Sequence, residues 1–314
     1  MQTFTTIIPI FAVIFLGFYA HRKGLMPPEF LGPANQLVYF LAIPALIFRA
    51  VSRASFHEEF NATVLLVTLS SAMLAYCVAW LIGRCTSWDP GRIGTFIQCS
   101  GHGNHGYIGL PIALYFLGES GLVKTSILAG FLMILQNILS VLILQAYSVS
   151  ERNMNLLAKL GLMAEKLVRN PVIISALAGI AASLLQLSLP SAIQRFIDIL
   201  SGLAPPLSLL LIGASISFEV IRKSLFSVLG SVAIKLLLLP TLGLALFTVF
   251  HLQPSEFLPG IILLATPTAT VTYVMSKEMY GDPEFAVAAI SASTLFSALT
   301  YLFWLMMIAG NDVP

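Results

Sequence analysis

The sequence predicts an all-α integral membrane protein with ten transmembrane helices in two inverted five-helix repeats, in which helices four and nine are broken. Three observations predict this fold. The 314 residues are 58% hydrophobic and only 10% charged, whereas a soluble domain carries roughly 25% charged residues. Apolar stretches of around 20 residues, the length that spans a bilayer, follow one another along the chain. Finally, proline and glycine motifs recur between its two halves.

The composition also excludes several classes of protein. A formal charge of +2 is too small to indicate nucleic acid as a partner. The three cysteines, Cys77, Cys85 and Cys99, lack the spacing of a metal site. No Lys or Arg precedes the first apolar stretch, and a secretory signal peptide needs such residues. We therefore expect the first stretch to be a retained span in a lipid bilayer.

Ten apolar stretches are candidate spans. They cover residues 4–20, 31–48, 62–81, 93–117, 122–147, 171–187, 193–216, 225–250, 257–279 and 284–309. The longest hydrophilic connection, 148–169, divides the chain into a first repeat at 1–147 and a second at 170–314. We expect this connection to be a cytoplasmic loop.

The two halves share motifs at a nearly constant offset. Pro9 with Gly17 recurs as Pro171 with Gly179, Leu41-Ala-Ile-Pro44 as Leu203-Ala-Pro-Pro206, and Gly118-Glu119 as Gly281-Asp282. Because five is an odd number, the second set of helices must be inserted upside-down relative to the first. Inverted repeats with interrupted helices at corresponding positions are typical of secondary transporters, whose site lies at the membrane midplane.

Positive charges predict the orientation of the spans. With the N-terminus outside, the inner segments hold eleven Lys and Arg residues and the outer segments hold four. Cytoplasmic loops carry the excess of such residues. We expect a multi-pass protein of the cell (inner or plasma) membrane with both termini outside.

The fourth stretch contains the strongest helix-breaking signal. Four glycines and one proline lie between Gly101 and Pro111. Glycine weakens a helix by entropy, and proline removes an N–H and clashes with the preceding turn. Irregular backbone at membrane depth requires partners in protein or a wet cavity. The segment therefore predicts a broken helix, although proline alone often produces only a kink.

The ninth stretch supplies a counterpart at residues 265–270. Pro267 interrupts the helix there, and Thr266, Thr268 and Thr270 offer hydroxyls for freed carbonyls or for a ligand. An ordinary kink is an equally open interpretation for this segment alone. If both helices break, their half-helix N-termini present free amides and positive dipole ends. That arrangement suits an anion, particularly a carboxylate.

Lys235 lies about ten residues into the eighth stretch, about 15 Å deep at about 1.5 Å per residue. An ionisable group at that depth is a functional candidate. It can balance the charge of a substrate carboxylate or stabilise the crossing helices. Alternatively it snorkels to the surface, or it bonds to carbonyls freed by Pro240 or Pro267. The sequence leaves these interpretations open.

Several motifs together resemble the auxin efflux carrier family over essentially the whole chain. They are Asn104 in Asn-x-x-x-x-Gly-x-Pro111, Arg169-Asn170-Pro171, Lys235-x-x-x-x-Pro240, Val274-Met-Ser-Lys-Glu278 with Gly281-Asp282, and Ser293-Thr-Leu-Phe-Ser297. The resemblance implies the ten-helix crossover fold that bile acid/sodium symporters and sodium/proton antiporters share. It also implies organic-anion transport, with spans one, two, six and seven as a scaffold and the other six as a transport domain.

The resemblance and the local pattern together predict a substrate-binding site. Its members are Asn104, His105, Pro111, Gln136, Asn137, Asn170, Lys235, Pro267, Thr268 and Thr270. Asn104, Gln136 and Asn170 match family positions. The third stretch, 62–81, contains no charged residue, whereas plant carriers have charges there. This departure weakens the case for auxin itself as the substrate, and monocarboxylates, dicarboxylates and indole acids all stay open.

The function that we predict is secondary active transport of small organic anions by alternating access. A cation- or proton-coupled exchanger of the same fold, and a carboxylate receptor without transport, are the alternatives. No span has an acidic residue at its middle, so proton coupling would use His102, His105 or the substrate's own proton. A coupling ion, proton or sodium, and a homodimer are left open.

We expect no cofactor, no metal and no enzymatic activity. His102 and His105 lie three residues apart, but no acidic residue stands beside them to act as a base. The chain also lacks a Gly-x-Ser-x-Gly nucleophile turn.

Overall fold

The computed structural model describes residues 2–54, 59–148, 169–187, 189–219 and 225–309. Within these residues the chain is helical and forms no strand. Of the helices in this described part of the chain, seven are long and apolar enough to cross a membrane, and two shorter apolar helices cover Pro171–Leu184 and Pro254–Leu264. The prediction of an all-α, multi-pass membrane protein is confirmed at this level. The ten-helix inverted repeat stays a prediction, and residues 149–168 of the predicted loop lie outside the described residues.

The chain divides into two compact units. The first contains Met1–Ala62, Gly106–Phe131 and Lys166–Ser215, and the second contains Thr63–His105, Leu132–Glu165 and Ile216–Pro314. The helices of spans one, two, six and seven fall in the first unit. Residues 106–131 also belong to it, although the resemblance assigned them to the transport domain.

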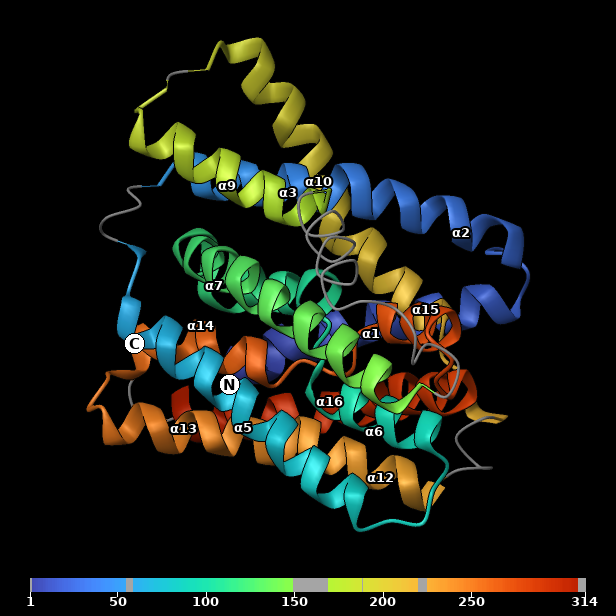
Figure 1. The fold of residues 1–314 in the computed structure, drawn as a ribbon. Helices are drawn as coiled ribbons and strands as arrows, with labels where there is room; N and C mark the ends of the chain where they lie inside the picture. The colour runs from blue at the N-terminus through green and yellow to red at the C-terminus, as the bar shows by residue number, and fades with distance from the viewer. Residues whose placement is uncertain (1, 55–58, 149–168, 188, 220–224, 310–314) are drawn as a thin grey trace. The chain divides into compact units, whose positions relative to one another are not determined.

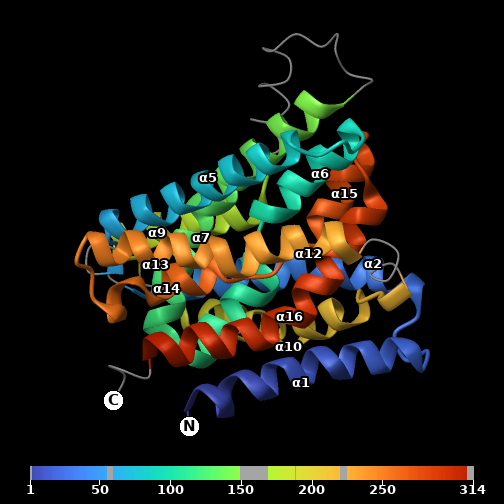
Figure 2. The same cartoon turned by 90° about the horizontal axis from the view of Figure 1, so that it is seen from below.

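In the first unit, α1 (Gln2–Arg22) lies along α10 (Ser191–Ala214), and α3 (Ile43–Ser52) lies along α9 (Pro171–Leu184) (Figures 1 and 2). The remaining elements are α2 (Pro28–Leu37) and η1 (Val38–Ala42). Glycines allow the close approach of α1 and α10, because a Cβ on Gly17 or Gly213 would overlap the backbone of the facing helix. Small residues of this kind let membrane helices pack tightly.

In the second unit, α6 (Pro90–Gly101), α12 (Leu225–Ala233) and α15 (Val271–Glu278) pack on α16 (Pro283–Ala309) (Figure 1). α13 (Leu239–Val249) packs on α14 (Pro254–Leu264). The other elements are α5 (Ala62–Arg84) and η3 (Ile234–Leu238). α7 (Leu110–Tyr147) turns at Gly118, whose φ is 73° and ψ is −165°, and continues from the first unit into the second.

Three π-helical segments have one physical cause. η1, η2 (His105–Gly109) and η3 each end two residues before a proline, which is Pro44, Pro111 or Pro240. Proline has no N–H, and its ring clashes with the carbonyl four residues earlier. The helical ladder widens locally to accommodate the ring, and such π-bulges are frequent at functional sites.

Pro111 and Pro240 offer no N–H to the carbonyl four residues earlier. A side chain from another helix binds each of these two carbonyls. Trp304 Nε1 donates to Leu236 O, four residues before Pro240, at 2.9 Å. Ser208 Oγ donates to Tyr107 O, four residues before Pro111, at 3.1 Å. Buried backbone groups need such partners, so η2 and η3 are each held by a side chain from a neighbouring helix.

We predict that Gly213→Ala destabilises the protein by about 1–3 kcal/mol, the cost of overpacking, because the new methyl group would meet the backbone of α1. Gly202→Ala on the same helix α10 is the control, since nothing lies within 4 Å of a Cβ there. Thermal unfolding of the two purified variants in detergent measures the difference. Equal melting temperatures would show that the α1–α10 contact does not limit stability.

Candidate functional site

Two helices of the second unit end where the sequence predicted breaks. α6 ends at Gly101, and His102 is extended, with φ −82° and ψ 105°, before η2 begins at His105. α14 ends at Leu264, and α15 begins at Val271. Residues 102–104 and 265–270 therefore leave the helical ladder, and their backbone groups need other partners.

The two breaks bind each other through their backbones. Gly103 and Thr268 form an antiparallel bridge, in which Asn104 N donates to Pro267 O at 2.8 Å and Ala269 N donates to His102 O at 3.0 Å. The approach is close enough to require glycine, because a Cβ on Gly103 would overlap the Thr266 hydroxyl. The predicted breaks are thus in direct contact.

Gln136 on α7 makes hydrogen bonds with the backbone groups that the first break leaves without helical partners. Its Nε2 donates to Gly101 O at 3.0 Å, and its Oε1 accepts from Gly103 N at 3.1 Å. His105 Nε2 lies 2.9 Å from the same Oε1. Since the amide oxygen can only accept, His105 carries a proton on Nε2 in this network. Gln136 is fully buried, and three groups of the break occupy its amide.

Ser140, one turn further along α7, holds His102. Its Oγ lies 2.8 Å from His102 Nδ1 and 3.2 Å from the hydroxyl of Tyr76 on α5. All three side chains are buried. The histidine that follows α6 is therefore tied to α5 and α7 through one hydroxyl.

The second break is satisfied by hydroxyls. Thr266 Oγ1 donates to Leu263 O at 2.6 Å, the carbonyl that faces Pro267 in the helical ladder. Thr268 N donates to Ser293 Oγ on α16 at 3.0 Å. Thr268 Oγ1 donates to Cys99 O of α6 at 2.9 Å, which adds a side-chain bond between the breaks.

Lys235 lies in η3 and is completely buried, with no solvent exposure. Its Nζ donates at 2.8 Å to the carbonyl of Leu264, the last residue of α14. A cation is favourable at the negative end of a helix dipole. Snorkelling is therefore excluded for Lys235 in this conformation, and the bond to a carbonyl freed at the Pro267 break is present. Among the described residues Lys235 forms no ion pair.

The predicted site residues are brought together only in part. Asn104, His105, Gln136, Lys235, Pro267 and Thr268 meet at the two breaks, and Thr270 is the N-cap position of α15. Asn137 instead donates to Met133 O within α7 at 2.8 Å. Pro111 and Asn170 belong to the first unit. The substrate contacts predicted for these residues stay predictions.

Asn170 has a clear local role. Its Oδ1 accepts from Val172 N at 2.9 Å and from Ile173 N at 3.4 Å, so its side chain caps the start of α9. Asparagine is among the best residues at this position, and Pro171 fits the first helical turn.

Sequence reasoning missed three residues of the hydrogen-bond network, which are Tyr76, Ser140 and Ser293. A signal for Ser140 exists, because it follows Gln136 by four residues and so shares its helix face. Ser293 begins the motif Ser293-Thr-Leu-Phe-Ser297, which marked the family but not a contact with the second break. Tyr76 gives no comparable signal, since single polar residues occur throughout apolar spans.

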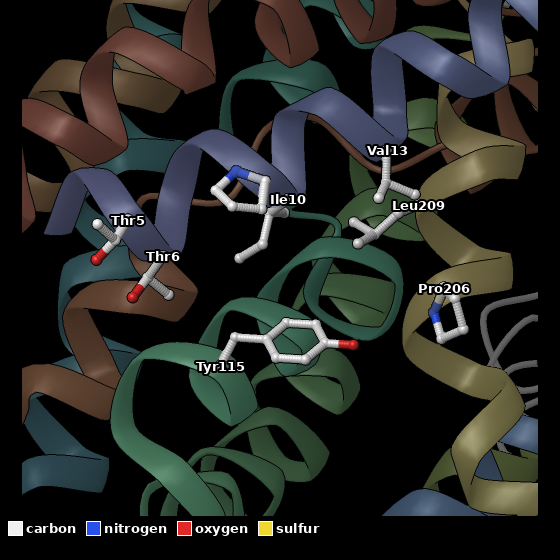
Figure 3. A pocket seen from close by; sticks show the side chains of 8 residues that line it. Thr5, Thr6, Ile10, Val13, Tyr115, Pro206 and Leu209 are labelled. Carbon is white, nitrogen blue, oxygen red and sulfur yellow. The ribbon is translucent and has the colours of Figure 1, made fainter. Parts of the chain in front are cut away.

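A separate pocket of about 340 Å³ lies in the first unit. It is lined by residues of α1, α7 and α10, and Tyr115 extends from α7 toward Pro206 (Figure 3). None of the predicted site residues lines it.

Comparison with known proteins identifies the class. The family model described as membrane transport protein matches residues 2–305. The protein is therefore a membrane transporter. The chain belongs to this family, the auxin efflux carrier family that its motifs resemble.

Curated relatives match along nearly their full lengths. A Rhizobium meliloti protein named "Putative malonate transporter" is 29% identical over 310 residues, covering 98% of this chain and 96% of the relative. An uncharacterized transporter of Methanothermobacter thermautotrophicus is 22% identical, with 97% and 98% covered. An uncharacterized transporter of Methanocaldococcus jannaschii is 21% identical, and the match covers 95% of this chain and 96% of the relative.

We predict that Gln136→Leu lowers stability by at least about 1–3 kcal/mol, the cost of leaving a buried polar group without a partner. The variant would leave Gly101 O, Gly103 N and His105 Nε2 without the hydrogen bonds that Gln136 now makes to them. Asn137→Leu, at the next residue, is the matched control because it removes only a bond to its own helix. Thermal unfolding compares the two variants, and an equal loss in both would contradict a special role for Gln136.

Proposed function

We propose that this protein is a secondary active transporter of small organic anions, chiefly carboxylates, that works by alternating access across the cell membrane. The substrate would bind where helices four and nine break and cross. In this proposal the ten spans form two inverted repeats, 1–147 and 170–314, joined by a cytoplasmic loop at 148–169, with both termini outside.

The environment of Lys235 is the observation that carries the proposal. A fully buried ammonium is costly unless it is paired. Among the described residues its hydrogen-bond partner is the neutral carbonyl of Leu264, and no carboxylate lies within ion-pairing distance. Its side chain also lies against Gly103, so it reaches both breaks. A carboxylate that entered here would supply the missing counter-charge.

The helix starts beside the breaks support the same ligand. α15 begins without a side-chain cap on its amides, and its N-terminus carries a partial positive charge. Asn104 precedes η2 and is 4% exposed, so its amide side chain can contribute a donor. The positive end of a helix dipole, a carboxamide and an ammonium together suit carboxylate oxygens.

The name of the Rhizobium relative favours a small dicarboxylate as the first compound to test. Malonate has two carboxylates close together. One would pair with Lys235, and the other would accept from Asn104 near the positive end of the α15 dipole. This division uses both kinds of donor that the breaks offer.

Flux measured in proteoliposomes tests the proposal. We expect the purified protein to transport radiolabelled malonate when a proton or sodium gradient is imposed across the vesicle membrane. Competition by unlabelled carboxylates shows whether another small carboxylate is preferred. Asn104→Ala should reduce this flux strongly without loss of folded protein, because alanine keeps the backbone bond to Pro267. Ligand binding without flux would identify a receptor, and wild-type flux in the variant would place the site elsewhere.

Lys235→Ala separates a charge role from a structural one. We expect the variant to weaken binding of the anion by more than binding of a neutral amide analogue, since only the anion gains from the ammonium. Thermal shift against both compounds measures the difference, because a ligand of the folded state raises the melting temperature. Equal losses for the two compounds would mean that Lys235 serves only to hold Leu264.

A further inference from the structure

α7 is shared between the two compact units. Its residues up to Phe131 belong to the first unit, and those from Leu132 onward belong to the second. Alternating access, on which this inference rests, requires the units to move against each other. Either α7 then bends near the boundary, or the segment 106–131 separates from the rest of the first unit.

A charged pair holds this segment at its corner. α7 turns at Gly118, and the next residue, Glu119, accepts from Arg49 Nη2 of α3 with both carboxylate oxygens, at 2.6 and 2.8 Å. The side chain of Arg49 is 18% exposed and that of Glu119 is 62% exposed. The pair therefore lies at the surface, where water can replace either group.

A second group of contacts lies beside the corner. Glu59, which precedes α5, accepts from Ser120 Oγ at 3.1 Å and lies 3.5 Å from Lys124 Nζ. Ser120 and Lys124 both belong to α7. Ionic and hydroxyl contacts therefore join the α7 corner to two other segments of the first unit, which are α3 and the residues before α5.

Arg49 has a replacement partner in place. Asp198 on α10 lies 4.0 Å from Arg49 Nη1 and already binds Arg53 Nη2 at 2.9 Å. When Glu119 moves away from Arg49, the Arg49 guanidinium can shift to Asp198. Its positive charge then keeps a negatively charged partner. Surface ion pairs are individually weak, and a weak bond with a ready exchange partner can open and close reversibly.

We propose that the Arg49–Glu119 pair is a conformational latch that holds the α7 corner on the first unit in this state and must open during each transport cycle. Glu59 with Lys124 assists it. The latch controls a step of the cycle and does not contact the substrate. By the predicted orientation it lies on the outer side of the membrane.

A reversible cross-link tests the latch. Arg49→Cys and Glu119→Cys are combined in a background with Cys77→Ser and Cys85→Ser, the two exposed cysteines. A bis-methanethiosulfonate of matching span then joins the two new thiols. We expect malonate flux in proteoliposomes to fall to background and to recover when the link is reduced.

The control joins two positions of the first unit that lie off α7. Ser183 Oγ donates to Ala54 O, and Ala54→Cys with Ser183→Cys carries the same reagent. This link should leave flux unchanged. If flux survives the Arg49–Glu119 link, α7 bends at the boundary and the latch is wrong. If both links stop flux, the first unit itself must deform, which also overturns the latch.

The unlinked variants separate this inference from the function on which it rests. If the unlinked protein moves none of the tested carboxylates, transport itself is contradicted. If it does so and the link has no effect, only the latch fails. Glu119→Gln supplies a second measurement, and we expect it to change the apparent KM or the turnover by about two- to fivefold, the range of a surface ion pair.

Discussion

The structure depends on one constraint, which is that backbone polar groups inside a bilayer must find partners within the protein. Two broken helices would violate it at Gly103, Leu263 and Leu264 unless other groups replaced the lost helical bonds. Gln136 and Thr266 supply most of the replacements, and Lys235 supplies the last one. The shape of the breaks is therefore held by side chains from α7, η3, α16 and the break itself.

Much of the local structure could be predicted because glycine and proline act on their own neighbourhood. The breaks occur at 102–104 and 265–270, inside the segments that those residues marked. Pro111 and Pro240 also explain η2 and η3, although π-helical turns could not be distinguished from simple kinks beforehand. Hydropathy was enough to predict a multi-pass membrane protein, since length and apolarity are properties of single segments.

The remaining features depend on which segments meet, and no single segment carries that information. Ser293 binds Thr268 N only because α16 passes the second break. Tyr76 reaches His102 through Ser140 for the same reason. The family pattern placed Asn170 near the substrate, whereas the structure shows its side chain capping α9. The sharing of α7 between two units is likewise a property of packing, which an unbroken apolar run does not reveal.

Side chains of the protein itself hold the backbone groups of the breaks, and this has a consequence for affinity. A site that must order itself on binding subtracts that cost from the interaction energy, and each immobilised side chain costs roughly 0.5–1.5 kcal/mol. Gln136 and Lys235 are already held in one arrangement, so a ligand would pay little of this entropy. A ligand with very few atoms makes few contacts, so it cannot offset the entropy lost when a flexible site becomes ordered. Such a ligand therefore needs a site whose side chains are already ordered.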